Sequence, residues 1–338
     1  MNKNFARRFR FLRSRTAAGA SAAVVAAAIV VAPRPSAALT ITPTFTAGFN
    51  SSFGANAIAA QNAWIAAANV FETNFSDNVH INITVNAVAG TGVFGQSSTP
   101  LLTGPYGLLR TGLIADAKTP DDFTSINPGG SVPATDPVGG THAWWVTRSQ
   151  AKALGLIPDD LTNDGTTTFG AGNNFTFSGA ITPGTFDFQG IAAHEISEVM
   201  GRLGLMGRTI GSFTNSYDVA DLFTFNSSGA RNLTCPSNDN WFSIDNGATR
   251  LKRKNDYCVN GLDTEDWAPG TNDAFNQFSS SGVVNPVSIV DLRAMDVIGY
   301  DRVASVVGTP EPSTFFLVAA GLAAFGASGY RRRSKHRS

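Results

Sequence analysis

The sequence predicts an α+β fold with a small mixed β-sheet, a helix near residues 190–201 and a loop-rich C-terminal half. Three observations support this prediction: an early segment with helical apolar spacing, a strictly alternating segment directly after it, and a low content of charged residues. Charged residues make up 15% of the 338, and the chain has 34 glycines. This composition is typical of a loop-rich exported protein that contains β-structure.

The first two elements follow from hydrophobic periodicity. Residues 53–72 place apolar side chains at helical spacing, which predicts an amphipathic helix. Residues 79–88 alternate apolar with polar side chains, which predicts a strand with one buried face. Shorter signals predict the remaining elements, namely helices at 104–118, 148–155 and 286–301, strands at 141–146 and 173–177, a loop at 119–141, and short strands and loops over 208–290.

The N-terminus has the composition of a signal peptide. A basic segment precedes an alanine-rich apolar run from Ala17 to Ala32, and small residues follow at Ser36 and Ala38. This order predicts cleavage by signal peptidase after Ala38.

The C-terminus has three parts in a fixed order. Pro310, Glu311 and Pro312 precede an apolar stretch from 314 to 330, and an arginine cluster follows. The apolar stretch is about long enough to cross a bilayer, and the arginines would hold its end on the cytoplasmic side.

This tail resembles the PEP-CTERM sorting signal of Gram-negative bacteria. The resemblance implies transient membrane anchoring through the C-terminal helix, recognition by an exosortase-type processing enzyme, and removal of the tail. The protein would then lie at the cell surface or in the extracellular matrix. An ordinary C-terminal membrane anchor is the alternative. The predicted organisation is a signal peptide at 1–38, a body at 39–307 and a sorting signal at 308–338.

The distribution of charge limits the class of partner that the protein can bind, and the two cysteines bear on the redox compartment. Lys+Arg and Asp+Glu both number 25, but the basic residues concentrate at the two ends, so the body is acidic. Because nucleic-acid binding needs clustered Lys and Arg, we expect no nucleic-acid partner. Cys235 and Cys258 are the two cysteines, and in an oxidising compartment they are expected to form a disulfide rather than stay free thiols.

One segment, GIAAHEISEVMGR at 190–202, combines residues with catalytic chemistry. In a helix, His194 and Glu198 lie one turn apart on the same face. An imidazole and a carboxylate in this arrangement can bind one Zn²⁺. Glu195 lies beside the first ligand, where it can accept a proton from a metal-activated water.

The same segment resembles the HExxH helix of zinc metallopeptidases, with Glu198 in place of the second histidine. The segments AAHEISEVMGR, DVADLFTF, NWFSIDNG, DTEDWAPGTNDAF and DLRAMDVIGYD, within 190–301, resemble secreted bacterial metalloproteases that carry PEP-CTERM tails. The resemblance implies a zincin-like domain and a zinc-dependent endopeptidase that acts on a protein or peptide. The extended metzincin pattern would also need a histidine at position 204, where this chain has Gly204.

For the third metal ligand we predict a downstream carboxylate, Asp221. Its separation from Glu198 is similar to that between the helix and the glutamate ligand of gluzincins. Asp218 and His142 are the alternatives. Two anionic ligands would leave the metal less positive, so manganese or iron are alternatives to zinc. Arg202 would pair with a carboxylate near the site or bind substrate.

Two acidic loops offer oxygen ligands for Ca²⁺. They are residues 263–266 with Asn272 and Asp273, and Asn238 and Asp239 with Asp245; ordinary solvated turns are the alternative. A non-catalytic function competes with the peptidase: a cell-surface or exopolysaccharide-matrix protein with a degenerate metalloprotease site, binding calcium or glycan. The missing second histidine favours this alternative.

Overall fold

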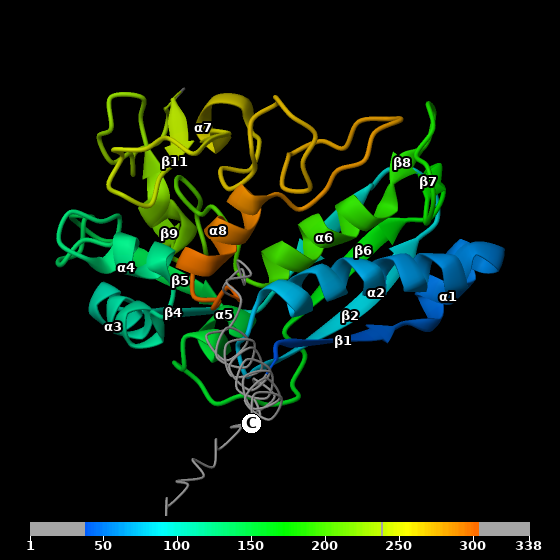
Figure 1. Ribbon diagram of the computed structural model, residues 1–338, viewed down its shortest axis with the longest axis horizontal. Helices are drawn as coiled ribbons and strands as arrows, with labels where there is room; N and C mark the ends of the chain where they lie inside the picture. The colour runs from blue at the N-terminus through cyan, green and yellow to red at the C-terminus, as the bar shows by residue number, and fades with distance from the viewer. Residues whose placement is uncertain (1–37, 238, 304–338) are drawn as a thin grey trace, which may run out of the picture. The chain divides into compact units, whose positions relative to one another are not determined.

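A computed structural model describes residues 38–237 and 239–303 (Figure 1). The predicted cleavage segment, apart from Ala38, and the predicted sorting signal lie outside these residues. Within the described ranges, no helix is both long and apolar enough to cross a bilayer. The membrane segment predicted at 314–330 is outside those ranges.

The largest sheet has four strands in the order β1-β2-β6-β3. These strands are β1 (Thr40–Phe45), β2 (His80–Val88), β6 (Gly165–Gly170) and β3 (Gly95–Ser98). β1 and β6 both pair in parallel with β2, whereas β3 pairs antiparallel with β6. Helices α2 (Ala57–Asn74) and α6 (Phe188–Val199) pack against each other on this sheet, and α6 lies along β3 and β6 (Figure 1).

The early periodicity is confirmed. β2 buries Ile81, Ile83 and Val85, while its alternate residues are half-buried or exposed. The predicted helix at 53–72 is divided into α1 (Ala47–Phe53), a 3₁₀ turn η1 (Gly54–Asn56) and α2. Its buried side chains pack against the sheet, where the indole N–H of Trp64 donates to Thr167 Oγ1 at 3.2 Å.

A second sheet, β4-β5-β9, lies beside three short helices. Its elements are β4 (Leu101–Gly104), α3 (Tyr106–Asp116), α4 (Pro120–Ile126), β5 (Ala143–Thr147), α5 (Arg148–Ala153) and β9 (Ser216–Asp218). The prediction of a loop from 119 to 141 is wrong at its start. Thr119 and Asp122 form a reciprocal capping box that begins α4, with Pro120 in its first turn.

Short elements make up the rest. They are β7 (Phe175–Thr176), β8 (Phe186–Asp187), η2 (Ala220–Phe223), β10 (Thr224–Phe225), β11 (Asn240–Phe242), β12 (Lys252–Lys254), α7 (Tyr257–Asn260) and α8 (Ile289–Val297). The predicted disulfide is confirmed: Cys235 and Cys258 are bonded, with their Cα atoms 5.6 Å apart. The α+β prediction is confirmed, although the strands form several small sheets rather than one.

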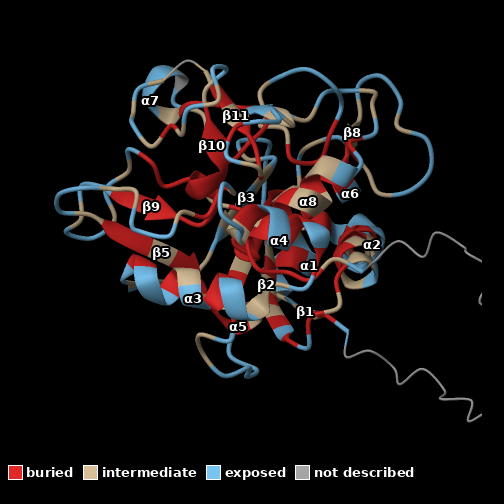
Figure 2. Ribbon diagram, turned by 60° about the vertical axis from the view of Figure 1, so that its left-hand side comes forward, coloured by how far each residue is buried: buried red, intermediate tan, exposed pale blue. Residues whose placement is uncertain are grey.

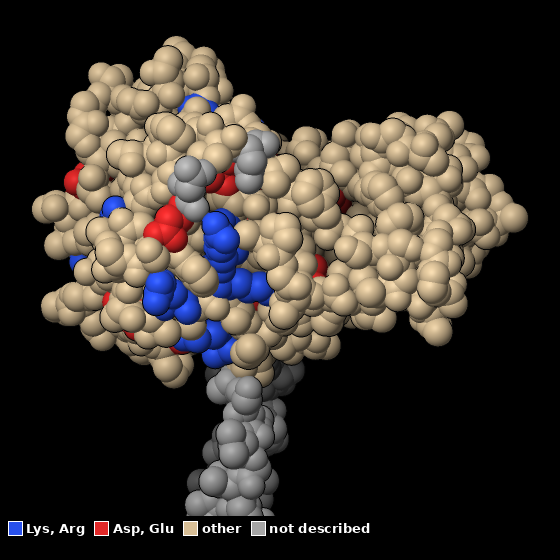
Figure 3. Space-filling view, turned by 90° about the horizontal axis from the view of Figure 1, so that it is seen from above, with Lys and Arg blue, Asp and Glu red and all other residues tan. Residues whose placement is uncertain are grey.

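Two parts of the chain differ in their content of charged residues. We call residues 38–98 and 165–199 the sheet region and residues 200–303 the loop region. The sheet region contains no Lys or Arg. Accordingly, the surface over α1, β7 and β8 shows neither Lys nor Arg in Figure 3. Burial nevertheless continues from the sheet into the loop region (Figure 2), so the loops there have a packed interior.

Candidate metal centre

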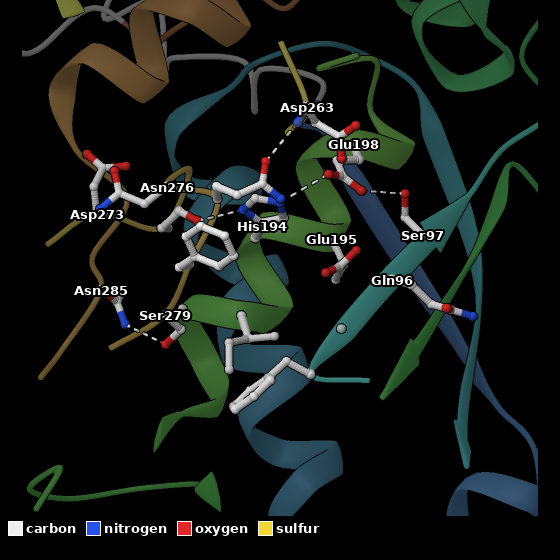
Figure 4. A pocket seen from close by; sticks show the side chains of 17 residues that line it. Gln96, Ser97, His194, Glu195, Glu198, Asp263, Asp273, Asn276, Ser279 and Asn285 are labelled. Atoms are coloured by element: carbon white, nitrogen blue, oxygen red, sulfur yellow. Dashed lines mark hydrogen bonds and ion pairs between the residues drawn. The ribbon is translucent and has the colours of Figure 1, made fainter. Parts of the chain in front are cut away.

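Helix α6 carries the predicted catalytic residues on one face. Its other face is buried through Ala192, Ile196 and Val199, which fixes the rotation of the helix against the sheet. His194, Glu195 and Glu198 line a cavity of about 270 Å³ between α6, β3 and the loops around 273–279 (Figure 4). The structure therefore brings these three predicted residues together at an open cavity.

A third group joins His194 and Glu198, and it is Asp266. One ligand atom from each of the three residues lies within 4.8 Å of the other two. His194 Nε2 lies 3.0 Å from Glu198 Oε1 and 3.5 Å from Asp266 Oδ1. Asp266 is fully buried, and its Oδ2 has no hydrogen-bond partner.

The imidazole of His194 is oriented by the main chain. Its Nδ1 lies 2.9 Å from the carbonyl oxygen of Ala274. A carbonyl only accepts, so Nδ1 carries the proton and Nε2 faces the two carboxylates. Burial alone would lower the pKa of His194, but the charge of Asp266, followed by that of Glu198, outweighs it and raises the pKa to about 9.

Glu198 is held in its charged form. Burial works against ionisation, but His194, Arg202 and the Ser97 hydroxyl outweigh it and lower the pKa of Glu198 to about 2. The Ser97 hydroxyl donates to Glu198 Oε2 at 2.7 Å. Because Ser97 belongs to β3, the edge strand of the sheet fixes the rotamer of this carboxylate.

Glu195 differs from Glu198 although it lies on the same helix. Burial, then the charge of Glu198, raises its pKa well above the ordinary value. Its Oε2 is buried without a hydrogen-bond partner. The side chain lies against Gly95 of β3, where an added Cβ would stand 2.9 Å from Glu195 Cγ. Glycine at position 95 therefore makes room for this carboxylate beside the cavity.

Arg202 lies behind the three-residue group. Its Nη1 donates to Asp266 Oδ1 at 2.6 Å, its Nε donates to Ser197 Oγ at 2.8 Å, and its Nη2 is 3.7 Å from Glu198 Oε1. The guanidinium also stacks over the Phe275 ring, 4.4 Å from its centroid. The expected pairing of Arg202 with a carboxylate near the site is confirmed, and the pair neutralises one of the two anionic charges.

The structure does not bring Asp221 to this group. Asp221 Oδ2 accepts from the backbone N–H groups of Leu205 and Asp218, and Lys254 is the main charge that opposes the effect of its burial. Asp218, the first alternative, lies beside Asp221 in the same buried cluster, where its Oδ1 accepts from the Asp221 backbone N–H at 3.1 Å. His142, the second alternative, lies 2.8 Å from Asp136 Oδ2 instead.

Sequence reasoning missed Asp266 as a ligand, although its segment was singled out as a calcium loop. The contact at Gly204 explains how Asp266 reaches the site. A Cβ at position 204 would lie 2.8 Å from the Glu265 backbone nitrogen. Position 204 is where the extended pattern needs a histidine, and the chain that leads to Asp266 packs there instead.

The loops predicted to bind calcium have protein partners. Asp263 pairs with Arg208 and Asp273 with Lys252, while Asp245 Oδ1 accepts from Ser243 and Thr249. Asn238 lies outside the described residues. Calcium binding by these loops stays a prediction.

The donor set fits a divalent transition metal. Zinc accepts imidazole and carboxylate ligands, and catalytic sites use three protein ligands with one position open to water. One imidazole and two carboxylates meet here beside a cavity. The unpartnered Asp266 Oδ2 and the Nε2 directed at two anions are what a cation at this point would satisfy.

Comparison with known proteins identifies the tail. Residues 309–333 match the PEP-CTERM protein-sorting motif. This match confirms the predicted sorting signal and indicates an exported protein that is sorted to the cell envelope or surface through an exosortase-type enzyme. No curated protein and no solved structure matches the chain.

Proposed function

We propose that the body of this protein is a metal-dependent endopeptidase of zincin type that acts outside the cytoplasmic membrane. The observation that supports it best is the convergence of His194, Glu198 and Asp266 on one point, with Glu195 beside them at an open cavity. His194, Glu198 and Asp266 would hold zinc or another divalent metal. When bound, the metal would supply a Lewis acid that polarises a carbonyl and makes water more acidic.

The protein's own residues would handle the proton. Glu195 accepts a proton from the attacking water and returns it to the nitrogen of the leaving amine, so it starts and ends the cycle in the same state. The buried Oε2 of Glu195 has no hydrogen-bond partner, so this oxygen is available to take up a proton. The Arg202 guanidinium offsets one carboxylate charge, which keeps a site with two anionic ligands more positive than its ligand set alone would make it.

A peptide substrate suits the cavity because β3 forms one of its walls. β3 ends the four-stranded sheet, and Gly95, Gln96 and Ser97 line the cavity. An extended peptide can add to the edge of a sheet through main-chain hydrogen bonds. This placement would set a peptide bond beside Glu195.

A second candidate is the non-catalytic surface or matrix protein. The observation that favours it is the ion pair between Arg202 and Asp266, because a guanidinium can replace a metal as the partner of these carboxylates. In that case the cluster would serve the stability of the fold alone.

Metal content and activity distinguish the two candidates. We expect the purified full-length protein to contain about one zinc or other transition-metal ion per chain and to cleave casein. Glu195→Gln should keep the metal and lose activity by about 10²-fold or more, since general acid–base groups contribute that much. Glu72→Gln, a glutamate outside the cavity, is the matched control.

Two further variants test the ligand set. Asp266→Asn should lose metal, whereas Asp221→Asn should retain it in the folded fraction. Absence of metal from the wild type, or failure of the wild type to cleave casein, would favour the matrix protein. Equal casein cleavage by the wild type and Glu195→Gln would remove Glu195 from the mechanism.

A further inference from the structure

A second group of carboxylates lies away from α6 and takes no part in the proposed peptidase. It contains Asp77, between α2 and β2, Asp116, the last residue of α3, and Asp301, which follows α8. One carboxylate oxygen from each lies within 4.8 Å of the other two. Asp77 and Asp301 are buried, with 5% and 3% of their surface exposed.

The described residues that contact this group carry too little positive charge to balance its three carboxylates. Lys118 alone provides a cation: its Nζ bonds Asp301 Oδ2 and lies 3.7 Å from Asp116 Oδ1. Asp122 adds a further negative charge nearby. Burial, then mutual repulsion, raises the pKa of Asp77 to about 7 and that of Asp116 to about 8.

One buried oxygen has no partner. Asp301 Oδ1 is enclosed and accepts no hydrogen bond, although Oδ2 of the same carboxylate bonds Lys118. One oxygen of this carboxylate lies within 4.8 Å of oxygens of Asp77 and Asp116, so the unpartnered oxygen lies at the group or directly beside it. A buried acceptor without a donor is costly unless a cation or water meets it.

The ammonium group of Lys118 can move away from the three carboxylates. Its side chain is 64% exposed, so its ammonium can move into water without being buried elsewhere. The chemistry of the three ligands also suits a particular ion. All three are carboxylates, and Ca²⁺ takes oxygen ligands in a flexible arrangement, whereas Mg²⁺ demands near-ideal octahedral geometry.

We propose that Asp77, Asp116 and Asp301 form a Ca²⁺ site, with Lys118 as the displaceable cation of the calcium-free form. Water would complete the coordination. The site joins the C-terminal end of the described body to the sheet region. It lies beside the main-chain hydrogen bonds from Ser76 N to Asp301 O and from Val303 N to Asn74 O. Extracellular calcium sites bind at about 10⁻⁴–10⁻³ M, so an exported protein would be loaded at its destination.

Substitution of a calcium ligand and substitution of Lys118 should change the calcium affinity in opposite directions. We expect calorimetric titration of CaCl₂ into the chelator-treated full-length protein to show one site. Asp116→Asn should weaken binding at least 10-fold, because a ligand is lost. Lys118→Met should tighten binding several-fold, because the competing ammonium is removed. Asp159→Asn, a matched change outside the group, should bind as the wild type does.

Thermal unfolding separates binding from damage to the fold. Without calcium, Asp116→Asn should be at least as stable as the wild type, since it removes a repelled carboxylate. With millimolar CaCl₂ only the wild type, Asp159→Asn and Lys118→Met should gain stability. The proposal is overturned if the wild type takes up no calcium, if Asp116→Asn and Lys118→Met bind like the wild type, or if Asp245→Asn abolishes the binding instead. None of these outcomes depends on peptidase activity.

Discussion

The sheet region buries three charged side chains, whereas the loop region buries eleven. The three are Asp77, Asp187 and Glu195; the eleven are Arg202, Asp218, Asp221, Lys254, Asp256, Glu265, Asp266, Asp273, Asp291, Asp296 and Asp301. The sheet region is filled by aromatic and aliphatic residues, including a cluster in which Phe188 contacts Phe53, Phe169, Phe175 and Phe177. The comparison teaches that the first interior depends on apolar burial, which has no direction, whereas the second also holds charged groups, whose hydrogen bonds and ion pairs have strict geometry.

The proposed metal centre lies where these two kinds of interior meet. His194, Glu195 and Glu198 come from a helix fixed by apolar packing, while Asp266 comes from a loop fixed by Arg202. The two sources explain why the helix could contribute a recognisable pattern and the loop could not.

The largest expected effect comes from breaking the central pair of the loop region. Arg202→Met should lower the free energy of unfolding by about 3–5 kcal/mol, because Asp266 is left as an unpaired buried charge. Denaturant unfolding measures this change. The double variant Arg202→Met/Asp266→Leu should recover most of the loss, since neither partner of the pair is left buried alone. A single variant as stable as the wild type would remove the distinction between the regions.

The disulfide is the next test, because it constrains only the loop region. Its cysteines are 23 residues apart, so replacing both with serine should cost about 3 kcal/mol. Hydrogen exchange should become faster for amides in 200–303 and stay slow in β2. Equal acceleration in both regions would mean that they unfold as one unit.

A pH titration of stability tests the buried acids. Burial, then the charge of Asp273, raises the pKa of Asp291 to about 7. The stability from this group is fully present below the unfolded value of 3.8 and is lost as the pH rises through about 7. The contribution of Asp291 to the free energy of unfolding should therefore fall by about 1 kcal/mol between pH 6 and 8. Because the pKa values of Asp77 and Asp116 are also raised, Asp291→Asn should reduce the slope by that amount rather than abolish it. An unchanged slope would contradict the contribution of Asp291.

The smallest expected effect lies in the sheet region. Ile83, which is 1% exposed in β2, loses one methyl group in Ile83→Val, at a cost of about 1 kcal/mol. This loss should not vary between pH 6 and 8 or with salt. A loss that changed with salt would show that charge also contributes to the sheet.

The parts of the fold that the sequence predicts are those set by local pattern. The alternation at 79–88 predicts β2 because burial of one face needs only a period of two. The segment 190–201 predicts α6 because its apolar spacing and its stop at Gly201 are local signals. The start of α4 was also encoded locally, in the box formed by Thr119 and Asp122, but the surrounding Pro, Gly and Asp residues favoured a loop.

Asp266 could not be found in this way. It is far from Glu198 in the sequence, and long-range contacts, among them its ion pair with Arg202 and the tight contact at Gly204, bring it to the helix. The prediction of Asp221 relied on the sequence separation between the helix and the glutamate ligand of gluzincins, whose set of metal ligands differs from this one. In this chain the same spacing leads to a buried acid next to Asp218 and Lys254.

The antiparallel bridge between Phe75 and Arg302 has a mechanical consequence. Residues 301–303 are bonded to residues 74–77 just before the sorting tail begins. When the tail is held at the cell envelope, tension enters the body through this bridge and passes to α2 and β2. The loops that line the cavity bear none of the load until the bridge ruptures. Single-molecule pulling on the C-terminus should therefore give a first rupture that Asn74→Ala does not alter but Asp77→Ala weakens, because Asn74 contributes its carbonyl and Asp77 its carboxylate. Early loss of the 263–285 loops would contradict this load path.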